Sequence, residues 1–114
     1  ENHIADNYLN KTLSEVKKET TGIKKLYLGS GPKVIDQYPS KDSIIDVNDT
    51  LILKTNANSY TLPSLKGYSK QEVKAICNML DLECSYKGYG YVSKQSISNK
   101  KVKAGTKVTF TFKN

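Results

Sequence analysis

The segment SKQEVKAICNML, residues 69–80, decides how the surrounding chain folds. Its apolar residues recur at positions i, i+3, i+4 and i+7, so one side of a helix would carry Val73, Ile76, Cys77 and Leu80. Ser69 and Glu72 have the spacing of a capping box, in which each side chain accepts a hydrogen bond from the other residue's backbone amide. The segment predicts an amphipathic helix that starts after Ser69 and ends near Leu80-Asp81.

After this helix, the apolar residues change to every second position, which is the period of a strand. The last run, VTFTF at residues 108–112, alternates strictly and predicts a strand with one buried face. Strands are expected at residues 82–86, 91–95 and 107–112, with turns at Lys87-Gly88 and at residues 104–106. The second half of the chain therefore predicts one helix packed on a three-stranded antiparallel sheet.

The first half of the chain repeats this order of elements. Aligning residues 12–15 with residues 69–72 also aligns residues 48–53 with residues 105–110. The capping-box spacing therefore occurs twice, and so does the alternating strand that ends each copy. Two copies of one small α+β unit are expected.

One inserted residue in the second copy brings Gln37 opposite Gln95. In the first copy, strands are expected at residues 25–28, 33–37 and 50–54. The polar stretch 56–59 has poor helix and strand propensity and is expected to be the joint. We therefore expect two repeats, at residues 1–56 and 57–114.

The composition is that of a folded, soluble chain, with 37% hydrophobic and 25% charged residues. No apolar run approaches the roughly 18 residues that cross a bilayer, so no membrane span is expected in this segment. The chain begins at Glu1 without a signal segment. We interpret it as part of a longer polypeptide, whose other parts can include an anchor or a catalytic domain.

The net charge of +7 comes from lysine alone, because all 18 basic residues are lysine and none is arginine. Arginine is the usual residue for bidentate contacts to guanine and phosphate, so sequence-specific recognition of nucleic acid is not expected. Lysine suits diffuse attraction to a polyphosphate wall polymer, an anionic lipid surface or a carboxylated glycan. The alternative is a solvated surface that keeps the chain soluble.

No catalytic or metal-binding constellation is visible in the sequence. The single histidine, His3, lies near an end, and neither Ser69-Lys70 nor Ser93-Lys94 has the Ser-x-x-Lys spacing of a penicillin-binding active site. We predict no catalytic residue, no metal and no cofactor. Cys77 and Cys84 lack partners at metal spacing, and the sequence leaves open whether they form a disulfide or are two buried side chains.

The second copy resembles the PASTA domain, which is named for penicillin-binding proteins and bacterial serine/threonine kinases. The resemblance rests on the proline-marked entry at residues 62–67, the cap at residues 69–72, the strand at residues 92–96 and the glycine-then-alternating ending at residues 104–110. The first copy is more degenerate, because it lacks the entry proline and has Asn10 where Gly67 stands. Asparagine tolerates left-handed backbone, so this difference is compatible with the same turn.

The resemblance implies a non-catalytic module outside the membrane of a Gram-positive bacterium, at the septal cell wall. Two copies resemble the C-terminal pair of a cell-division class B penicillin-binding protein, so the implied partners are peptidoglycan or a wall polymer and the parent transpeptidase. The competing hypothesis is the ectodomain of a serine/threonine kinase that senses wall fragments. A third, suggested by the charge, is a non-specific nucleic-acid binder, whose affinity would fall steeply with salt.

One cluster of residues is a candidate ligand-binding site. Its aromatic members, beside two glycines, could stack on the C–H faces of a sugar; they are Tyr86, Tyr89 and Tyr91. Lys87 and Lys94 could attract a stem-peptide carboxylate or a wall phosphate. The alternative is structural: Tyr86 and Tyr91 as cross-strand partners of a hairpin whose turn is formed by residues 88–90.

Overall fold

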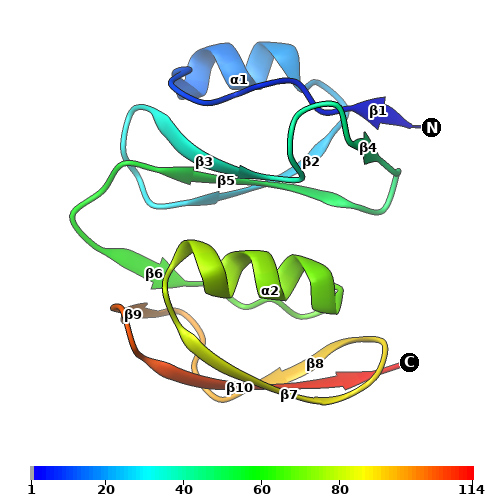
Figure 1. The fold of residues 1–114 in the computed structure, drawn as a ribbon, viewed down its shortest axis with the longest axis vertical. Helices are drawn as coiled ribbons and strands as arrows, with labels where there is room; N and C mark the ends of the chain where they lie inside the picture. Colours follow the sequence, from blue (N-terminus) through cyan, green and yellow to red (C-terminus); the bar gives the residue numbers. More distant parts are fainter. Residues whose placement is uncertain (1) are drawn as a thin grey trace. The chain divides into compact units, whose positions relative to one another are not determined.

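The computed structural model describes residues 2–114, which form two compact units. Unit 1 ends at Asn58, and unit 2 is Ser59–Asn114. Within each unit, one helix covers one face of a three-stranded sheet (Figure 1). The α+β class and the composition of each unit, one helix and a three-stranded sheet, are confirmed.

The elements follow the same order in both units. Unit 1 consists of β1 (His3–Ile4), α1 (Leu13–Glu19), β2 (Lys24–Leu28), β3 (Val34–Tyr38), β4 (Ile44–Ile45) and β5 (Thr50–Thr55). Unit 2 consists of β6 (Tyr60–Leu62), α2 (Lys70–Met79), β7 (Glu83–Gly88), β8 (Tyr91–Gln95), β9 (Lys100–Val102) and β10 (Lys107–Lys113). No helix in residues 2–114 has the length and apolar character to cross a membrane.

Both helices begin at the predicted capping boxes. The Ser69 side chain accepts from the Glu72 amide at 3.2 Å, and the Glu72 carboxylate accepts from the Ser69 amide at 2.9 Å. Thr12 and Glu15 make the same reciprocal pair at the start of α1. The reciprocal bonds satisfy amides that would otherwise lack a partner in the first turn, which fixes where each helix starts.

The core of unit 2 lies between α2 and its sheet. The apolar side of α2 is buried as its spacing predicts, and so are the alternate residues of β10; these residues are Val73, Ile76, Cys77, Val108, Phe110 and Phe112. Unit 1 has a matching core in which Val16 of α1 is fully buried with Leu51 and Leu53 of β5. Burial of each large apolar side chain contributes roughly 1.5–3 kcal/mol, so these residues supply most of the stability of each thin unit.

Each three-stranded sheet is mixed, so the prediction of an antiparallel sheet was wrong. The orders are β2-β5-β3 and β7-β10-β8, in which the central strand runs parallel to the first strand and antiparallel to the second. The last strand of each unit has the most buried residues of its three-stranded sheet, and in the central position it makes hydrogen bonds on both edges. The two earlier strands flank it and run in opposite directions, so one of them is parallel to it and the other antiparallel.

The loop at residues 88–90 crosses the end of β10 and is not a hairpin turn. Tyr86 pairs with Phe110, and Tyr91 pairs with Lys113, so the predicted cross-strand pairing of the two tyrosines is also wrong. The crossing brings backbones close together: a Cβ on Gly88 would lie 2.4 Å from the Phe112 carbonyl oxygen. Glycine is required at Gly88 by this approach as well as by its φ of +84°.

In each unit a glutamine side chain holds the segment that precedes the helix, residues 2–11 in unit 1 and 59–68 in unit 2, which we call the lead-in segment. Gln95 accepts from the Leu65 amide at 2.7 Å and donates from Nε2 to the carbonyl oxygens of Pro63 and Ile97, both at 2.9 Å. In unit 1 Gln37 makes the equivalent bonds, to the Tyr8 amide and to the carbonyls of Asp6 and Pro39. The alignment of Gln37 with Gln95 was the only sequence signal of this role.

The lead-in segments also form two short ribbons that the sequence did not predict. β1 pairs with β4 in unit 1, and β6 pairs with β9 in unit 2, both antiparallel. Just after each ribbon the chain takes left-handed backbone, at Asn10 (φ 68°) and Gly67 (φ 87°). Asn10 therefore serves the turn for which the second copy uses glycine, as the asparagine replacement suggested.

Cys77 and Cys84 form a disulfide that ties α2 to β7. Their Cα atoms are 6.5 Å apart, within the range that a disulfide spans. The bond connects the helix to an edge strand of the sheet, so it constrains the two layers around the core of unit 2.

Reduction of this disulfide is expected to lower the free energy of unfolding of unit 2 by about 2.5 kcal/mol, because the bond closes a short loop in the unfolded chain. Urea unfolding with and without dithiothreitol measures the difference. The Cys77→Ala/Cys84→Ala double variant is the control and should not respond to dithiothreitol. An unchanged midpoint in wild type, with reduction verified by thiol counting, would contradict the expected contribution.

Candidate functional site

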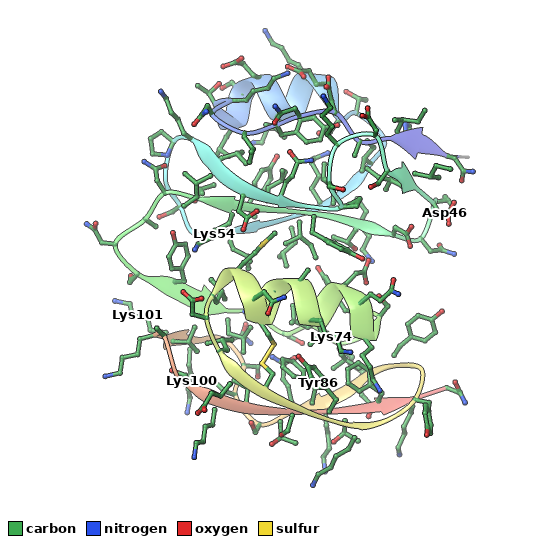
Figure 2. The ribbon with its side chains drawn as sticks, in the orientation of Figure 1. Asp46, Lys54, Lys74, Tyr86, Lys100 and Lys101 are labelled. Atoms are coloured by element: carbon green, nitrogen blue, oxygen red, sulfur yellow. A yellow bond between two sulfur atoms is a disulfide. The ribbon has the colours of Figure 1, made fainter. Side chains whose placement is uncertain are left out.

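The candidate residues of the ligand site lie on two opposite sides of the unit 2 sheet. Tyr86 is on the side of α2, where its ring centroid lies 6.5 Å from that of Phe110 and 6.2 Å from that of Phe112. Lys74 of α2 places its Nζ 5.6 Å from the centre of the same ring, and Figure 2 shows the two side chains together. Burial raises the pKa of the Tyr86 phenol, which therefore stays neutral at physiological pH. Tyr86 serves the packing of the helix on the sheet.

Tyr89 is the most exposed of the three tyrosines, with 80% of its surface accessible. It also belongs to the helix side, because Lys70 of α2 holds its Nζ 5.5 Å from the Tyr89 ring centre. The same ammonium lies 5.1 Å from the Phe112 ring centre and donates to the Gly88 carbonyl at 3.1 Å. Cation–π attraction and this hydrogen bond therefore fix Tyr89 and the crossing loop against α2.

Lys87, Lys94 and Tyr91 lie on the opposite side of the sheet, away from α2. Alternation along β7 turns Lys87 away from the side that Tyr86 occupies. Thr111 of β10 pairs with Lys87 on one side and Lys94 on the other, so these three residues form one row across the sheet. A register shift between Thr111 and Phe112 keeps Tyr91, opposite Lys113, on this side as well.

We call this side of the sheet the outer face. Its residues are Glu83, Ser85, Lys87, Tyr91, Lys94, Lys107, Thr109, Thr111 and Lys113. Two of its four lysines, Lys107 and Lys113, were not candidates from the sequence. The signal was present in the strict alternation of β10, which turns both lysines away from the buried residues.

The outer face combines ammonium groups with hydroxyl groups. Ser85 and Thr109 share a hydrogen bond of 3.0 Å, and both line an open surface pocket formed by residues of β7 and β10. In Figure 2, side chains with nitrogen tips extend from the sheet of unit 2 on the side away from α2. Such a face can bind anions and hydroxylated chains through charge and hydrogen bonds.

The structure shows which candidate side chains lie close enough together to form a metal site or a single stacking surface of tyrosine rings. In residues 2–114, no three His, Cys, Asp or Glu side chains lie close enough to hold a metal ion. The three tyrosines do not form one platform, since Tyr91 alone lies on the outer face. The outer face therefore brings together three of the five candidate residues: Tyr91, Lys87 and Lys94.

Residues 60–114 match the family model of the PASTA domain. No curated protein sequence matches the chain. Among solved structures, the chain is similar over its whole length to penicillin-binding protein 2X from Streptococcus thermophilus, with a TM-score of 0.84 and 23% identity. The chain spans 17% of that protein, and the likeness shows a shared fold.

Two structures of kinase origin are similar to the chain at a lower level. The extracellular region of the serine/threonine kinase PrkC from Staphylococcus aureus gives a TM-score of 0.40 and 14% identity over 98% of this chain and 46% of that one. The three-PASTA-domain structure of a serine/threonine kinase from the same organism gives 0.41 and 17%, over 98% of this chain and 65% of that one.

Proposed function

The chain carries a PASTA domain over residues 60–114, and from this premise we propose that it positions a parent penicillin-binding transpeptidase at the cell wall by associating with peptidoglycan. PASTA domains are non-catalytic, extracellular modules of penicillin-binding proteins and serine/threonine kinases. The family match over unit 2 carries the proposal. The parent is a cell-division enzyme of a Gram-positive bacterium, and the module acts at the septum.

Two further observations support this function. Unit 1 repeats the element order, capping box and glutamine contacts of unit 2, so the chain is a tandem of one module. The fold likeness to penicillin-binding protein 2X extends over both units. A kinase ectodomain is the alternative parent; an upstream Ser-x-x-Lys domain and an intracellular kinase domain distinguish the two in the full sequence.

Retention of the chain on purified peptidoglycan tests the proposal. We expect retention on peptidoglycan stripped of phosphate polymers to persist at high salt, because stacking and hydrogen bonds are screened less than exposed charges. The variant Tyr89→Ala/Tyr91→Ala removes the two exposed rings of unit 2 and should weaken retention. The matched control Ile44→Ala/Val47→Ala removes two exposed apolar side chains of unit 1 and should leave it unchanged. Absence of wild-type retention would contradict direct association with peptidoglycan.

A further inference from the structure

The net charge of the chain belongs entirely to unit 2. Residues 59–114 carry ten lysines and three carboxylates, whereas residues 1–58 carry eight of each. The net charges of the two units, which share one fold, thus differ by the full +7 of the chain. Solubility alone does not require this asymmetry, since unit 1 has the same fold with balanced charge.

The outer face concentrates this charge. Its four lysines are exposed, and none of them forms an ion pair with a carboxylate of residues 2–114. Glu83 is the only acidic residue of the outer face and lies at its end, opposite Lys107. The remaining surface between the lysines carries hydroxyl groups, so Glu83 is the only outer-face residue whose charge offsets the positive potential there.

Unit 1 provides an internal comparison, because the register of its sheet is equivalent. Where Ser85 pairs with Thr109 in unit 2, Leu26 pairs with Ile52 in unit 1. Leu28 takes the place of Lys87 beside the central strand.

On the other side of the central strand, where β3 pairs with β5 and β8 pairs with β10, unit 2 is again the more basic of the two units. Asp36 pairs with Lys54 in unit 1, where Lys94 pairs with Thr111 in unit 2. The positions that hold Ser85, Thr109 and Lys87 in unit 2 thus carry apolar side chains in unit 1, and the basic residue Lys54 of unit 1 has an acidic partner, Asp36, where Lys94 stands in unit 2. The basic outer face is a property of unit 2 and not of the fold.

The extent of the outer face indicates a polymer as its ligand. Lys107 and Lys113 stand at the two ends of β10, about 20 Å apart along the strand, and Lys87 and Lys94 are two strand spacings apart, about 10 Å. One small anion cannot reach all four ammonium groups. A chain with regularly repeated charges can, and lysine binds phosphate well as a point charge.

The hydroxyl groups and Tyr91 favour a polyol backbone between the phosphates. Thr109, Thr111 and Ser85 can exchange hydrogen bonds with ligand hydroxyls, and Tyr91, beside Lys113, is 58% exposed. We propose that the outer face of unit 2 binds a linear polyol phosphodiester polymer of the cell wall. This assignment rests on the proposed location at the wall, and it names a ligand different from peptidoglycan.

Binding of the full chain to soluble poly(glycerol phosphate) tests the assignment. If four phosphates are neutralised, the slope of log affinity against log salt is roughly −3, so the affinity falls roughly 50-fold between about 50 and 200 mM salt. The outer-face variant Lys87→Gln/Lys94→Gln/Lys107→Gln/Lys113→Gln should bind at least about tenfold more weakly at low salt and lose most of this slope. The four side chains are exposed, so its unfolding midpoint should stay near that of wild type.

Two control variants separate the outer face from diffuse attraction. Lys17→Gln/Lys18→Gln/Lys33→Gln/Lys41→Gln makes the same charge change at exposed positions of unit 1, and it should retain the affinity and the slope. Lys100→Gln/Lys101→Gln/Lys103→Gln removes a second lysine group of unit 2, two members of which are labelled in Figure 2, and should also retain most binding. Equal losses in all variants would overturn the assignment to the outer face.

Other probes decide the chemistry of the ligand. Tighter binding of single-stranded DNA, of hyaluronate or of phosphatidylglycerol vesicles than of poly(glycerol phosphate) would overturn the polyol phosphodiester. Absence of wild-type binding to the polymer, with retention on stripped peptidoglycan, would overturn this inference alone. Binding to the polymer without retention on stripped peptidoglycan would support the inference and contradict only direct association with peptidoglycan.

Discussion

Replacing Gly88 with alanine is expected to lower the free energy of unfolding of unit 2 by about 3–4 kcal/mol. Left-handed backbone at φ +84° costs a residue with a Cβ about 1–2 kcal/mol. The added methyl would lie 2.4 Å from the Phe112 carbonyl oxygen, and relief of that overlap requires a shift of the central strand, at about 1–3 kcal/mol more. Since small domains are stable by about 5–15 kcal/mol, the variant should unfold at a much lower urea concentration.

Gly67→Ala is the matched control for the cost of left-handed backbone alone. Gly67 has a φ of +87°, and a Cβ there would meet no atom within 4 Å. We expect this variant to lose only about 1–2 kcal/mol. The difference between the two variants, measured from urea midpoints with the disulfide intact, is the cost of the contact with β10. Equal losses of unfolding free energy in Gly88→Ala and Gly67→Ala would contradict the close approach of the loop to β10.

Gln95→Met is expected to cost about 3 kcal/mol. Methionine fills nearly the same volume, but the Leu65 amide and the carbonyls of Pro63 and Ile97 each lose a hydrogen-bond partner. An unsatisfied buried backbone group costs about 1–3 kcal/mol, and the carbonyls recover part of this if water reaches them. The lead-in segment of unit 2 should then separate from β8 before the sheet unfolds.

Hydrogen exchange at the Leu65 amide measures this separation directly. Exchange at Leu65 should become faster in Gln95→Met while the amides of β10 keep most of their protection. Gln71→Met, at an exposed position of α2, makes the same chemical change without removing these contacts and should have little effect. Unaltered exchange at Leu65 in Gln95→Met would refute the proposed role of the glutamine.

Local signals in the sequence were sufficient to predict the starts of both helices and the last strand of each unit. The capping boxes mark both helix starts, and the alternation over residues 108–112 identified the strand that became β10. The order of the strands depends on a choice between distant segments. Nothing between Tyr86 and Tyr91 indicates that residues 107–113 lie between them, so the short glycine-containing loop predicted a hairpin.

The same limit applies to the candidate site. Tyr86, Tyr89 and Tyr91 were predicted to form one cluster because they are close along the chain. In the structure they lie on two sides of the sheet, because side chains alternate along each strand and Lys70 contacts Tyr89 on the side of α2. Lys107 and Lys113 join Lys87 and Lys94 only through the register of β10 with its two neighbours. A list of residues close in sequence therefore could not contain the whole outer face.

The position of β5 and β10 has a consequence for the order in which the protein can form. Each is the central strand of its sheet and also the last strand of its unit. In a polypeptide that emerges amino end first from a ribosome or a translocation pore, β7 and β8 have no partner strand until residues 107–113 have emerged. Unit 1 can complete its sheet while unit 2 is still incomplete, and a ribosome stalled before residue 107 would leave two unpaired strands exposed to aggregation.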